Sequence, residues 1–257
     1  MKITLLGTGT STGVPMIGCP CAVCHSTDPR DKRLRVSALV QHDGQNILID
    51  TSADFRQQML ALSITHLEAI LYTHQHYDHI AGFDDLRAFQ FLHKKSPACF
   101  ALQETYDHIR STFDYAFGGA IQSGGGLPKA AFTVIDESPF DVLGLHIVPV
   151  PLLHGAMEIL GFRIGPFAYL TDCNAIPKSS YPLLDGLDTL VLDGLRFKTH
   201  STHFSIAEAV QQAERIASRI TYLTHMNHDV MHEPTERELP PHVRLAYDGL
   251  TFEFPDA

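Results

Sequence analysis

The chain has 257 residues, of which 44% are hydrophobic and 19% are charged, and its formal net charge at pH 7 is −10. This size and composition suit one α/β catalytic domain with a substantial core, while the acidic balance argues against broad electrostatic binding of nucleic acid or anionic membranes. No apolar run approaches the roughly 18 residues of a membrane span, and the chain starts directly with a predicted strand, so we expect a cytoplasmic protein.

The first elements are a strand, a glycine-rich loop and a hairpin. Residues 3–6 predict the strand, and residues 7–13 follow it as Gly-Thr-Gly-Thr-Ser-Thr-Gly. Such a loop can cradle phosphate, but this spacing matches neither of the two common phosphate-binding patterns. Residues 37–50 predict a β-hairpin about Asp43-Gly44, which is a strong turn pair.

Three of the five cysteines, Cys19, Cys21 and Cys24, form a C-x-C-x2-C run between these elements. Thiolates at this spacing suit tetrahedral zinc and are poorly placed for disulfides within the run. We expect His228 to be the fourth ligand, with His25 as the nearby competitor. The simpler alternative is a set of reduced thiols without metal.

The next predicted strand, residues 67–73, runs directly into His74-Gln75-His76-Tyr77-Asp78-His79. Apolar residues at helical spacing follow over residues 80–93, so the histidines lie in a loop between a strand and a helix. Imidazoles and a carboxylate packed this closely can bind one divalent cation and hold a second nearby. Loops at the carboxyl ends of strands are where α/β folds build their sites.

The middle of the chain is less regular. Residues 83–129 hold a helical stretch and then two glycine clusters, at 118–119 and 124–126, which predict a mobile flap over a cleft or a plain solvent loop. We therefore expect a single domain spanning residues 1–257, with this flap or insertion at about 84–131.

Regular elements return in the second half of the chain. Residues 132–151 predict two strands about a turn near Leu143-Gly144, and residues 188–193 predict another strand. Residues 205–218 predict an amphipathic helix, because Ser205 and Glu208 have the spacing of a capping box.

The run from His74 to His79 resembles the His-x-His-x-Asp-His signature of the metallo-β-lactamase superfamily, and the match is complete. The resemblance implies an α/β fold, the αβ/βα sandwich, in which two mixed sheets carry helices on their outer faces. It also implies two active-site metal ions whose remaining ligands follow later strands. The implied set is His74, His76 and His154 on one ion, Asp78, His79 and His225 on the other, Asp172 as the bridge, and Asp50 orienting a ligand histidine.

A loop with two further histidines precedes the predicted helix at 205–218. Its Thr-His-Phe-Ser-Ile element resembles the segment that carries the general-acid histidine in phosphodiesterases of this superfamily, which makes His203 the candidate proton donor. His200 is the runner-up. The alternative is that His203 only caps the helix or binds water.

The chain also resembles the phosphoribosyl 1,2-cyclic phosphate phosphodiesterases, because the Cys-rich loop occurs together with Thr-His-x-x-His at residues 224–228. The resemblance implies a metal-dependent phosphodiesterase that hydrolyses a small cyclic phosphodiester through a hydroxide between two Zn or Mn ions. It also implies one additional structural zinc, a small-molecule substrate and no membrane partner, and a homodimer is compatible with it.

Three other functions remain open. The same scaffold supports thioesterases, lactonases and glyoxalase-type enzymes, which act on carbonyl substrates and would not need His203. A tRNA 3′-processing nuclease is disfavoured by the acidic charge. A non-catalytic zinc-binding module is disfavoured because it has no chemical use for seven site ligands.

Overall fold

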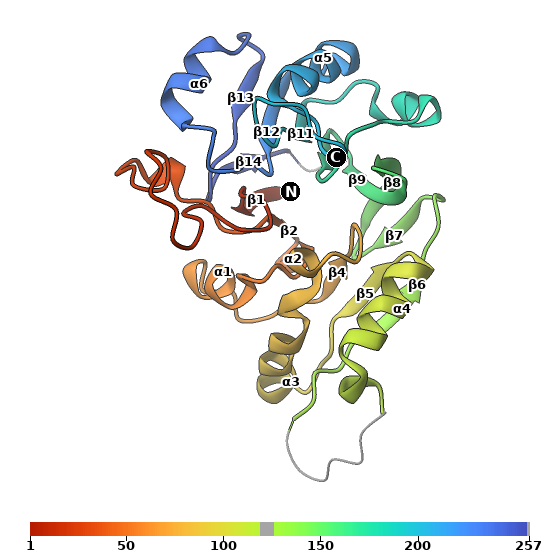
Figure 1. Cartoon of the computed structure of the whole chain (residues 1–257). Coiled ribbons are helices and arrows are strands. Elements are labelled where there is room, and N and C mark those ends of the chain that lie inside the picture. Colours follow the sequence, from red (N-terminus) through yellow and green to blue (C-terminus); the bar gives the residue numbers. More distant parts are fainter. Residues whose placement is uncertain (119–125, 256–257) are drawn as a thin grey trace. The chain divides into compact units, whose positions relative to one another are not determined.

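The computed structural model describes residues 1–118 and 126–255. The chain divides into two compact units, each built on a seven-stranded sheet (Figure 1). Unit 1 comprises residues 1–4, 37–136 and 251–257, and unit 2 comprises residues 5–36 and 137–250. Within the described ranges no helix is both long and apolar enough to cross a bilayer. Of the glycines assigned to a flap, those at 119, 124 and 125 lie outside the described residues.

The sheet of unit 1 is mixed. In spatial order its strands are β14 (Thr251–Glu253), β1 (Lys2–Gly7), β2 (Ser37–His42), β3 (Gln45–Ile49), β4 (Ala69–Leu71), β5 (Ala98–Ala101) and β6 (Ala131–Val134). Each neighbouring pair from β3 to β6 is parallel, whereas β14 with β1 and β2 with β3 are antiparallel. The predicted hairpin is confirmed, and its turn residues Asp43 and Gly44 both have positive φ, as a tight hairpin turn requires.

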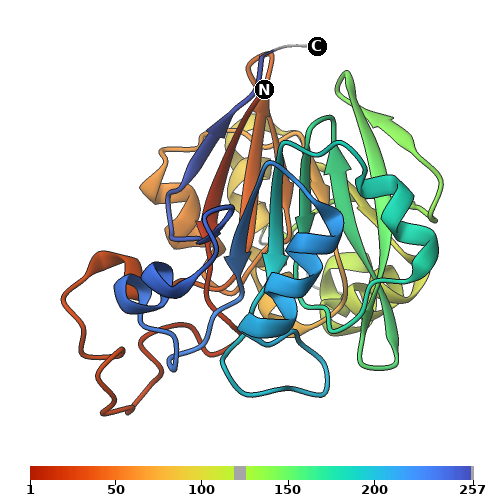
Figure 2. The ribbon, with the colours of Figure 1, turned by 90° about the horizontal axis from the view of Figure 1, so that it is seen from above.

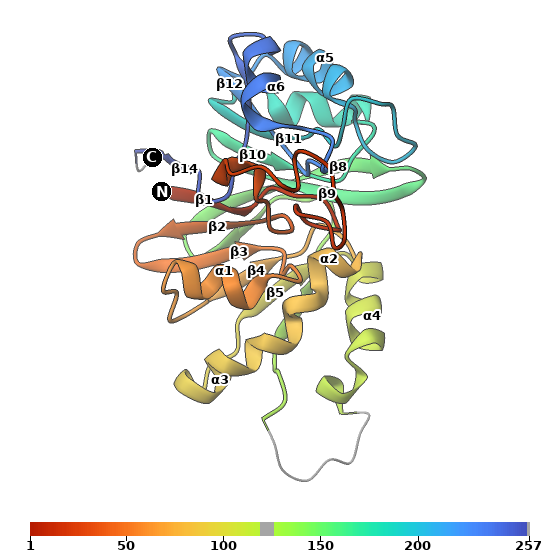
Figure 3. The same cartoon turned by 60° about the vertical axis from the view of Figure 1, so that its left-hand side comes forward.

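The helices of unit 1 lie on one side of its sheet (Figure 3). They are α1 (Phe55–Ala61), α2 (Tyr77–Ile80), η2 (Ala81–Leu86), α3 (Arg87–His93), α4 (Gln103–Thr112) and η3 (Asp114–Phe117). The prediction of one helix over residues 80–93 is wrong, because the tighter 3-10 turn of η2 interrupts it. Gly82 lies so close to α1 that a Cβ there would be 2.3 Å from Cβ of Phe55. The contact with α1 therefore decides the local backbone.

The sheet of unit 2 is also mixed. Its order is β13 (Val243–Leu245), β12 (Ile220–Thr224), β11 (Thr189–Asp193), β10 (Phe167–Leu170), β9 (Met157–Ile164), β8 (Leu145–His154) and β7 (Phe140–Val142). The strands from β10 to β13 are parallel, and those from β7 to β10 are antiparallel. Two 3-10 helices, η1 (Pro29–Asp31) and η4 (Lys178–Leu184), and two α-helices, α5 (Ile206–Ile216) and α6 (His232–Glu238), complete the unit.

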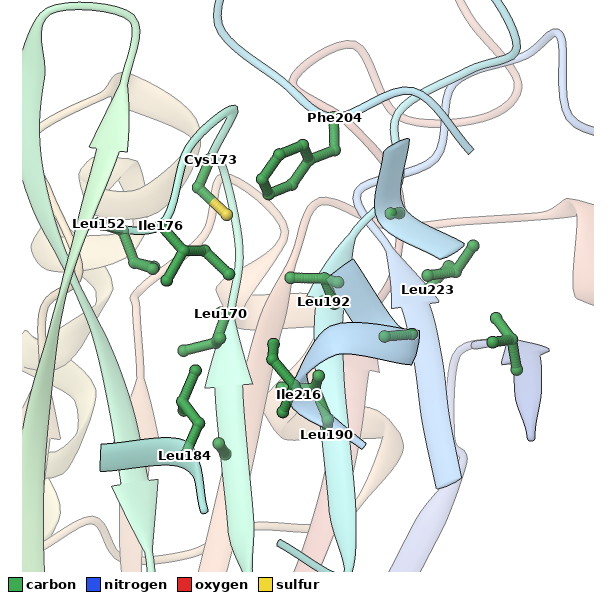
Figure 4. Close-up of a cluster of buried hydrophobic side chains, with 14 of the residues drawn as sticks. Leu152, Leu170, Cys173, Ile176, Leu184, Leu190, Leu192, Phe204, Ile216 and Leu223 are labelled. Atoms are coloured by element: carbon green, nitrogen blue, oxygen red, sulfur yellow. The ribbon is translucent and has the colours of Figure 1, made fainter. Parts of the chain in front are cut away.

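Helix α5 covers the parallel strands of unit 2 (Figure 2). The predicted capping box is confirmed, because Ser205 accepts from the Glu208 amide while the Glu208 carboxylate accepts from the Ser205 amide. The helix buries Ile206, Ala209, Ala213 and Ile216 in a core cluster with leucines of β10, β11 and β12 (Figure 4). This packing fixes the strand ends that carry the candidate site residues of the unit.

Candidate metal centre

In unit 1 the metal-binding motif begins just after β4 and runs into α2. The ring centroid of His74 lies 4.1 Å from that of His79 and 4.7 Å from that of His76. Nε2 of His79 is 3.6 Å from Oδ2 of Asp78. Three imidazoles and one carboxylate are therefore gathered in one place, as the spacing predicts.

Asp50 follows β3 and organises two of these rings. Its Oδ2 accepts from Nδ1 of His79 at 2.8 Å and from Oγ1 of Thr73 at 2.8 Å, and its Oδ1 accepts from the Thr73 amide at 2.8 Å. Because the Thr73 hydroxyl donates to Asp50, it accepts from Nδ1 of His74, 3.0 Å away. Both histidines thus carry the proton on Nδ1, and Nε2 has the lone pair that a metal needs. Burial raises the pKa of Asp50, against the opposing effect of His79.

In unit 2 three strand ends bring the other candidates together. His154 is the last residue of β8, while Asp172 and His225 follow β10 and β12. Oδ2 of Asp172 is 3.1 Å from Nε2 of His225. His154 donates from Nδ1 to the Thr202 carbonyl at 2.8 Å, so its Nε2 also has the lone pair. Burial lowers the pKa of His154, which favours the neutral ring that binds metal.

Three of these residues have an unusual backbone. Asp50, Asp172 and His225 have φ values of 61°, 57° and 61°, in the left-handed region that residues other than glycine rarely adopt. Each lies at the turn directly beyond a strand, and such strain is typical of functional sites. The sequence pattern does not reveal this left-handed backbone.

His203 has a partner that the sequence reasoning missed. Its Nδ1 donates to Oδ2 of Asp193 at 2.7 Å, and Asp193 is the fully buried last residue of β11. The His203 ring stacks on His225 with a centroid distance of 4.7 Å, and ligand atoms of His154, Asp172 and His203 lie within 4.8 Å of one another. The available signal was that Asp193 ends a predicted strand, as Asp50 does.

His200 lies beside this pair in a different environment. Its ring centroid is 5.2 Å from that of His203. Nδ1 of His200 accepts from the amide and the hydroxyl of Thr202, at 3.3 and 3.1 Å, whereas Nδ1 of His203 contacts a carboxylate. Burial lowers the pKa of His200, so the neutral ring with its proton on Nε2 is favoured.

The Cys-rich loop gathers on His228, also within unit 2. Nδ1 of His228 is 3.3 Å from Sγ of Cys19 and 3.4 Å from Sγ of Cys21, and Cys24 completes a group whose ligand atoms lie within 4.8 Å of one another. The Cys24 amide and His228 lower the pKa of Cys21 to about 6, which favours the thiolate. The competitor His25 is not part of this group. Three sulfurs and one imidazole are a donor set that suits zinc.

The glycine-rich loop after β1 binds protein backbone. A Cβ at Gly7 would lie 2.0 Å from the Arg35 carbonyl oxygen, so only glycine fits. Gly9 pairs with Met226, whose amide donates to the Thr8 carbonyl and whose carbonyl accepts from the Thr10 amide. Because Met226 lies between His225 and His228, these bonds anchor the segment that carries both candidate ligands.

Comparison with known proteins places this geometry in context. Residues 45–226 match the family model described as "Beta-lactamase superfamily domain". The chain is 41% identical over 256 residues to a protein named octanoyltransferase from Porphyromonas gingivalis, and the match covers 97% of this chain but 51% of that protein. This chain therefore spans about half the length of that relative.

Two solved structures are also similar. A crystal structure described as "a New Diphosphatase from the PhnP Family" is 43% identical with a TM-score of 0.92, covering 98% of this chain and 97% of that one. Zn²⁺-bound PqqB from Methylobacterium extorquens has a TM-score of 0.80 at 20% identity, over 99% of this chain and 100% of that one. The second likeness concerns the fold alone.

Proposed function

Because this chain belongs to the β-lactamase superfamily and, within it, to the PhnP family, we propose that it is a metal-dependent phosphodiesterase that hydrolyses a small cyclic phosphodiester. The observation that carries the proposal is the pair of His203 and the buried Asp193 carboxylate beside the candidate ligands of unit 2. An alkoxide leaves phosphorus poorly unless a proton is supplied to it. A histidine held by a carboxylate is suited to supply that proton.

The proposed metal ligands are those that the family resemblance implies. Within each unit, hydrogen bonds hold some of these ligands in place. One ion would be held by His74, His76 and His154, the other by Asp78, His79 and His225, with Asp172 as the bridge. The donor set fits, because His74, His79 and His154 are all held with Nε2 as the ligand nitrogen. When bound, two divalent ions supply Lewis-acid stabilisation of charge on the phosphate and lower the pKa of water. Both Zn and Mn suit these ligands.

The side chains of the protein supply the remaining chemistry. Asp193 keeps the Nδ1 proton of His203 in place, so that Nε2 faces the site and delivers its proton to the departing oxygen. His200 presents Nε2–H and is proposed to donate a hydrogen bond to a phosphate oxygen. His203 is thus preferred over His200 as the general acid.

A second candidate is hydrolysis of a diphosphate, which is favoured by the diphosphatase described for the similar PhnP-family structure. The leaving group is then a phosphate, which is a weaker base than an alkoxide and needs less help from His203. Octanoyl transfer is not proposed, because the relative of that name is about twice as long as this chain.

A substrate panel tests the proposal. The metal-loaded protein is expected to hydrolyse bis(p-nitrophenyl) phosphate and a five-membered cyclic phosphodiester, and to act poorly on p-nitrophenyl phosphate, whose additional charge repels the nucleophile. The same panel includes a dinucleoside diphosphate, a thioester and a lactone. Turnover of the diphosphate alone would favour the second candidate, diphosphate hydrolysis. Turnover of the thioester or the lactone alone would reject the hydrolysis of phosphoesters.

We further propose that Cys19, Cys21, Cys24 and His228 bind one structural zinc. Four protein ligands leave no open position for water, so the ion organises the loop without taking part in chemistry. Soft thiolates favour zinc over manganese at this position. A cytoplasmic location, which keeps thiols reduced, suits this role.

A further inference from the structure

Three segments of unit 2 meet at the side chain of Asn174. Its Oδ1 accepts from the Gly155 amide at 2.8 Å, and its Nδ2 donates to the Ser201 carbonyl at 3.0 Å. The backbone N–H of Asn174 donates to the Leu153 carbonyl at 3.0 Å. One residue therefore joins the end of β8, the segment after β10 and the loop between β11 and α5.

That loop in turn contacts the candidate ligand at the end of β8. The carbonyl that accepts from Nδ1 of His154 belongs to Thr202, the neighbour of Ser201. The Thr202 side chain of this loop also packs against the backbone of Gly155, because a Cβ on Gly155 would be 3.0 Å from Cγ2 of Thr202. The hydrogen bond that sets the tautomer of His154 thus depends on where residues 201–202 are held.

The end of this loop next to α5 is attached to the same segment by a second hydrogen bond. Phe204 donates its amide to the Cys173 carbonyl at 2.8 Å, and both side chains lie together at one end of the core cluster (Figure 4). His203 is therefore placed between two attachments to the segment 173–174, one through Phe204 and one through the Asn174 side chain. The Asn174 attachment is the nearer of the two to the Thr202 carbonyl, because it holds the neighbouring residue Ser201.

We propose that Asn174 is a positioning residue, which holds the Thr202 carbonyl on His154 and so fixes the ligand tautomer of His154 and the place of His203. The amide side chain is required, because the contact with Gly155 needs an acceptor and the contact with Ser201 needs a donor. An aspartate would keep the first contact and repel the Ser201 carbonyl. The effect on catalysis rests on the proposed function, whereas the effect on His154 does not.

The structural effect is measured by NMR of the ring N–H protons in ¹⁵N-histidine-labelled, zinc-loaded protein. The wild type is expected to give a slowly exchanging Nδ1–H signal from His154, assigned by its loss in His154→Gln. In Asn174→Ala and Asn174→Asp this proton should exchange at least about tenfold faster. Exchange within twofold of wild type in both variants would overturn the proposal, and so would a wild-type rate in Asn174→Asp alone, because the Gly155 contact would then suffice.

Asn46→Ala is the matched control. Asn46, like Asn174, is an asparagine whose side chain joins two segments, since its Nδ2 donates to the His66 carbonyl at 2.9 Å and its Oδ1 accepts from Gln41 at 3.0 Å; Asn46 is buried, whereas Asn174 is half-buried. It lies in unit 1, near the start of β3. Its loss should lower stability and leave the His154 signal unchanged. A His154 signal altered equally by this control would mean general loosening, which overturns the specific role of Asn174.

The catalytic effect is measured on the metal-loaded enzyme. With a cyclic phosphodiester, which has a poor leaving group, kcat of Asn174→Asp should fall by about 10- to 100-fold, the range usual for groups that orient metal ligands. With bis(p-nitrophenyl) phosphate the fall should be smaller, because that leaving group needs little protonation and only the part of the loss that arises from His154 remains. Equal losses on both substrates would contradict a role acting through His203. A wild type inactive on both diesters would reject the proposed function and leave the NMR result standing.

Discussion

At the scale of single residues, the strand ends account for most of the candidate site. The family resemblance, together with their places after apolar strands, predicted roles for Asp50, Asp172 and His225, and the structure gives all three a left-handed backbone. It found Asp193 only as the end of a strand. The hydrogen bond from His203 to Asp193 joins residues ten positions apart, across an irregular loop, and no periodic pattern predicts where such a loop returns.

The first prediction concerns this pair. Asp193→Asn should preserve the shape of the site but remove the negative charge that holds the Nδ1 proton of His203, so kcat with a poor leaving group should fall by about 10²-fold or more. Asp188→Asn, at the other end of β11, removes an exposed ion pair with Arg219 and is the control, which should retain activity. Steady-state kinetics with a cyclic phosphodiester compare the two. A near wild-type kcat in Asp193→Asn would remove the pair from the mechanism.

Among the helices, strands and turns, those with a strong local sequence signal were predicted, and several with a weak signal were missed. The hairpin at Asp43-Gly44 and the capping box of α5 were predicted because a few neighbouring residues specify them. Helix α6 and the short strand β13 were missed because His232–Glu238 is highly polar and Val243–Leu245 has three residues. The longer strand β9 was missed because its sequence, MEILGFRI, has a central glycine and no strict alternation.

The opening loop gives a prediction about pH. Asp248 accepts from Thr8 Oγ1 and from the Leu34 amide, and burial raises its pKa from 3.8 to about 7. Between these values the unfolded chain has lost a proton that the folded chain keeps, so the free energy of unfolding falls as pH rises, by about 1.4 kcal/mol per pH unit. This contribution is fully present below about pH 4 and is lost by about pH 7.

Urea unfolding of wild type and Asp248→Asn at several pH values measures this effect, because the difference between the two cancels the other titrating groups. The free energy of unfolding of the wild type, relative to that of the variant, should fall between pH 4 and 7. Above about pH 7 the difference between the two free energies should be constant. A difference that does not change with pH would contradict the raised pKa.

The Cys-rich loop gives a second prediction at this scale. Cys21→Ser should lower the zinc content by one ion per chain and lower the melting temperature, since a structural zinc contributes its binding energy to folding. Cys99→Ser, at a buried thiol outside the cluster, should keep its zinc. Metal analysis with thermal unfolding under reducing conditions compares them. Unchanged zinc in Cys21→Ser, or a disulfide within the loop of the wild type, would refute the site.

At the scale of the whole molecule, the predicted fold class is confirmed. Two mixed seven-stranded sheets with helices, together with the family match over residues 45–226, agree with the αβ/βα sandwich of the metallo-β-lactamase fold. The motif from His74 to His79 was sufficient for this because it resembles the signature of the superfamily, and the resemblance implies the fold. The substrate depends on side chains around the site and on loops, which follow no such pattern. A formal charge of −10 repels phosphates in general, so bound divalent ions must supply the local attraction.

The proposed phosphodiesterase mechanism depends on the proton that His203 supplies to the leaving oxygen, and a single variant isolates that proton. Metal-loaded wild type and His203→Ala are compared on an unactivated cyclic phosphodiester and on bis(p-nitrophenyl) phosphate. We expect the variant to lose about 10²- to 10⁴-fold in kcat on the cyclic substrate, the usual contribution of a general acid, and less than about tenfold on the activated one. Equal losses on the two substrates, or a wild type that leaves the cyclic phosphodiester intact, would contradict the account.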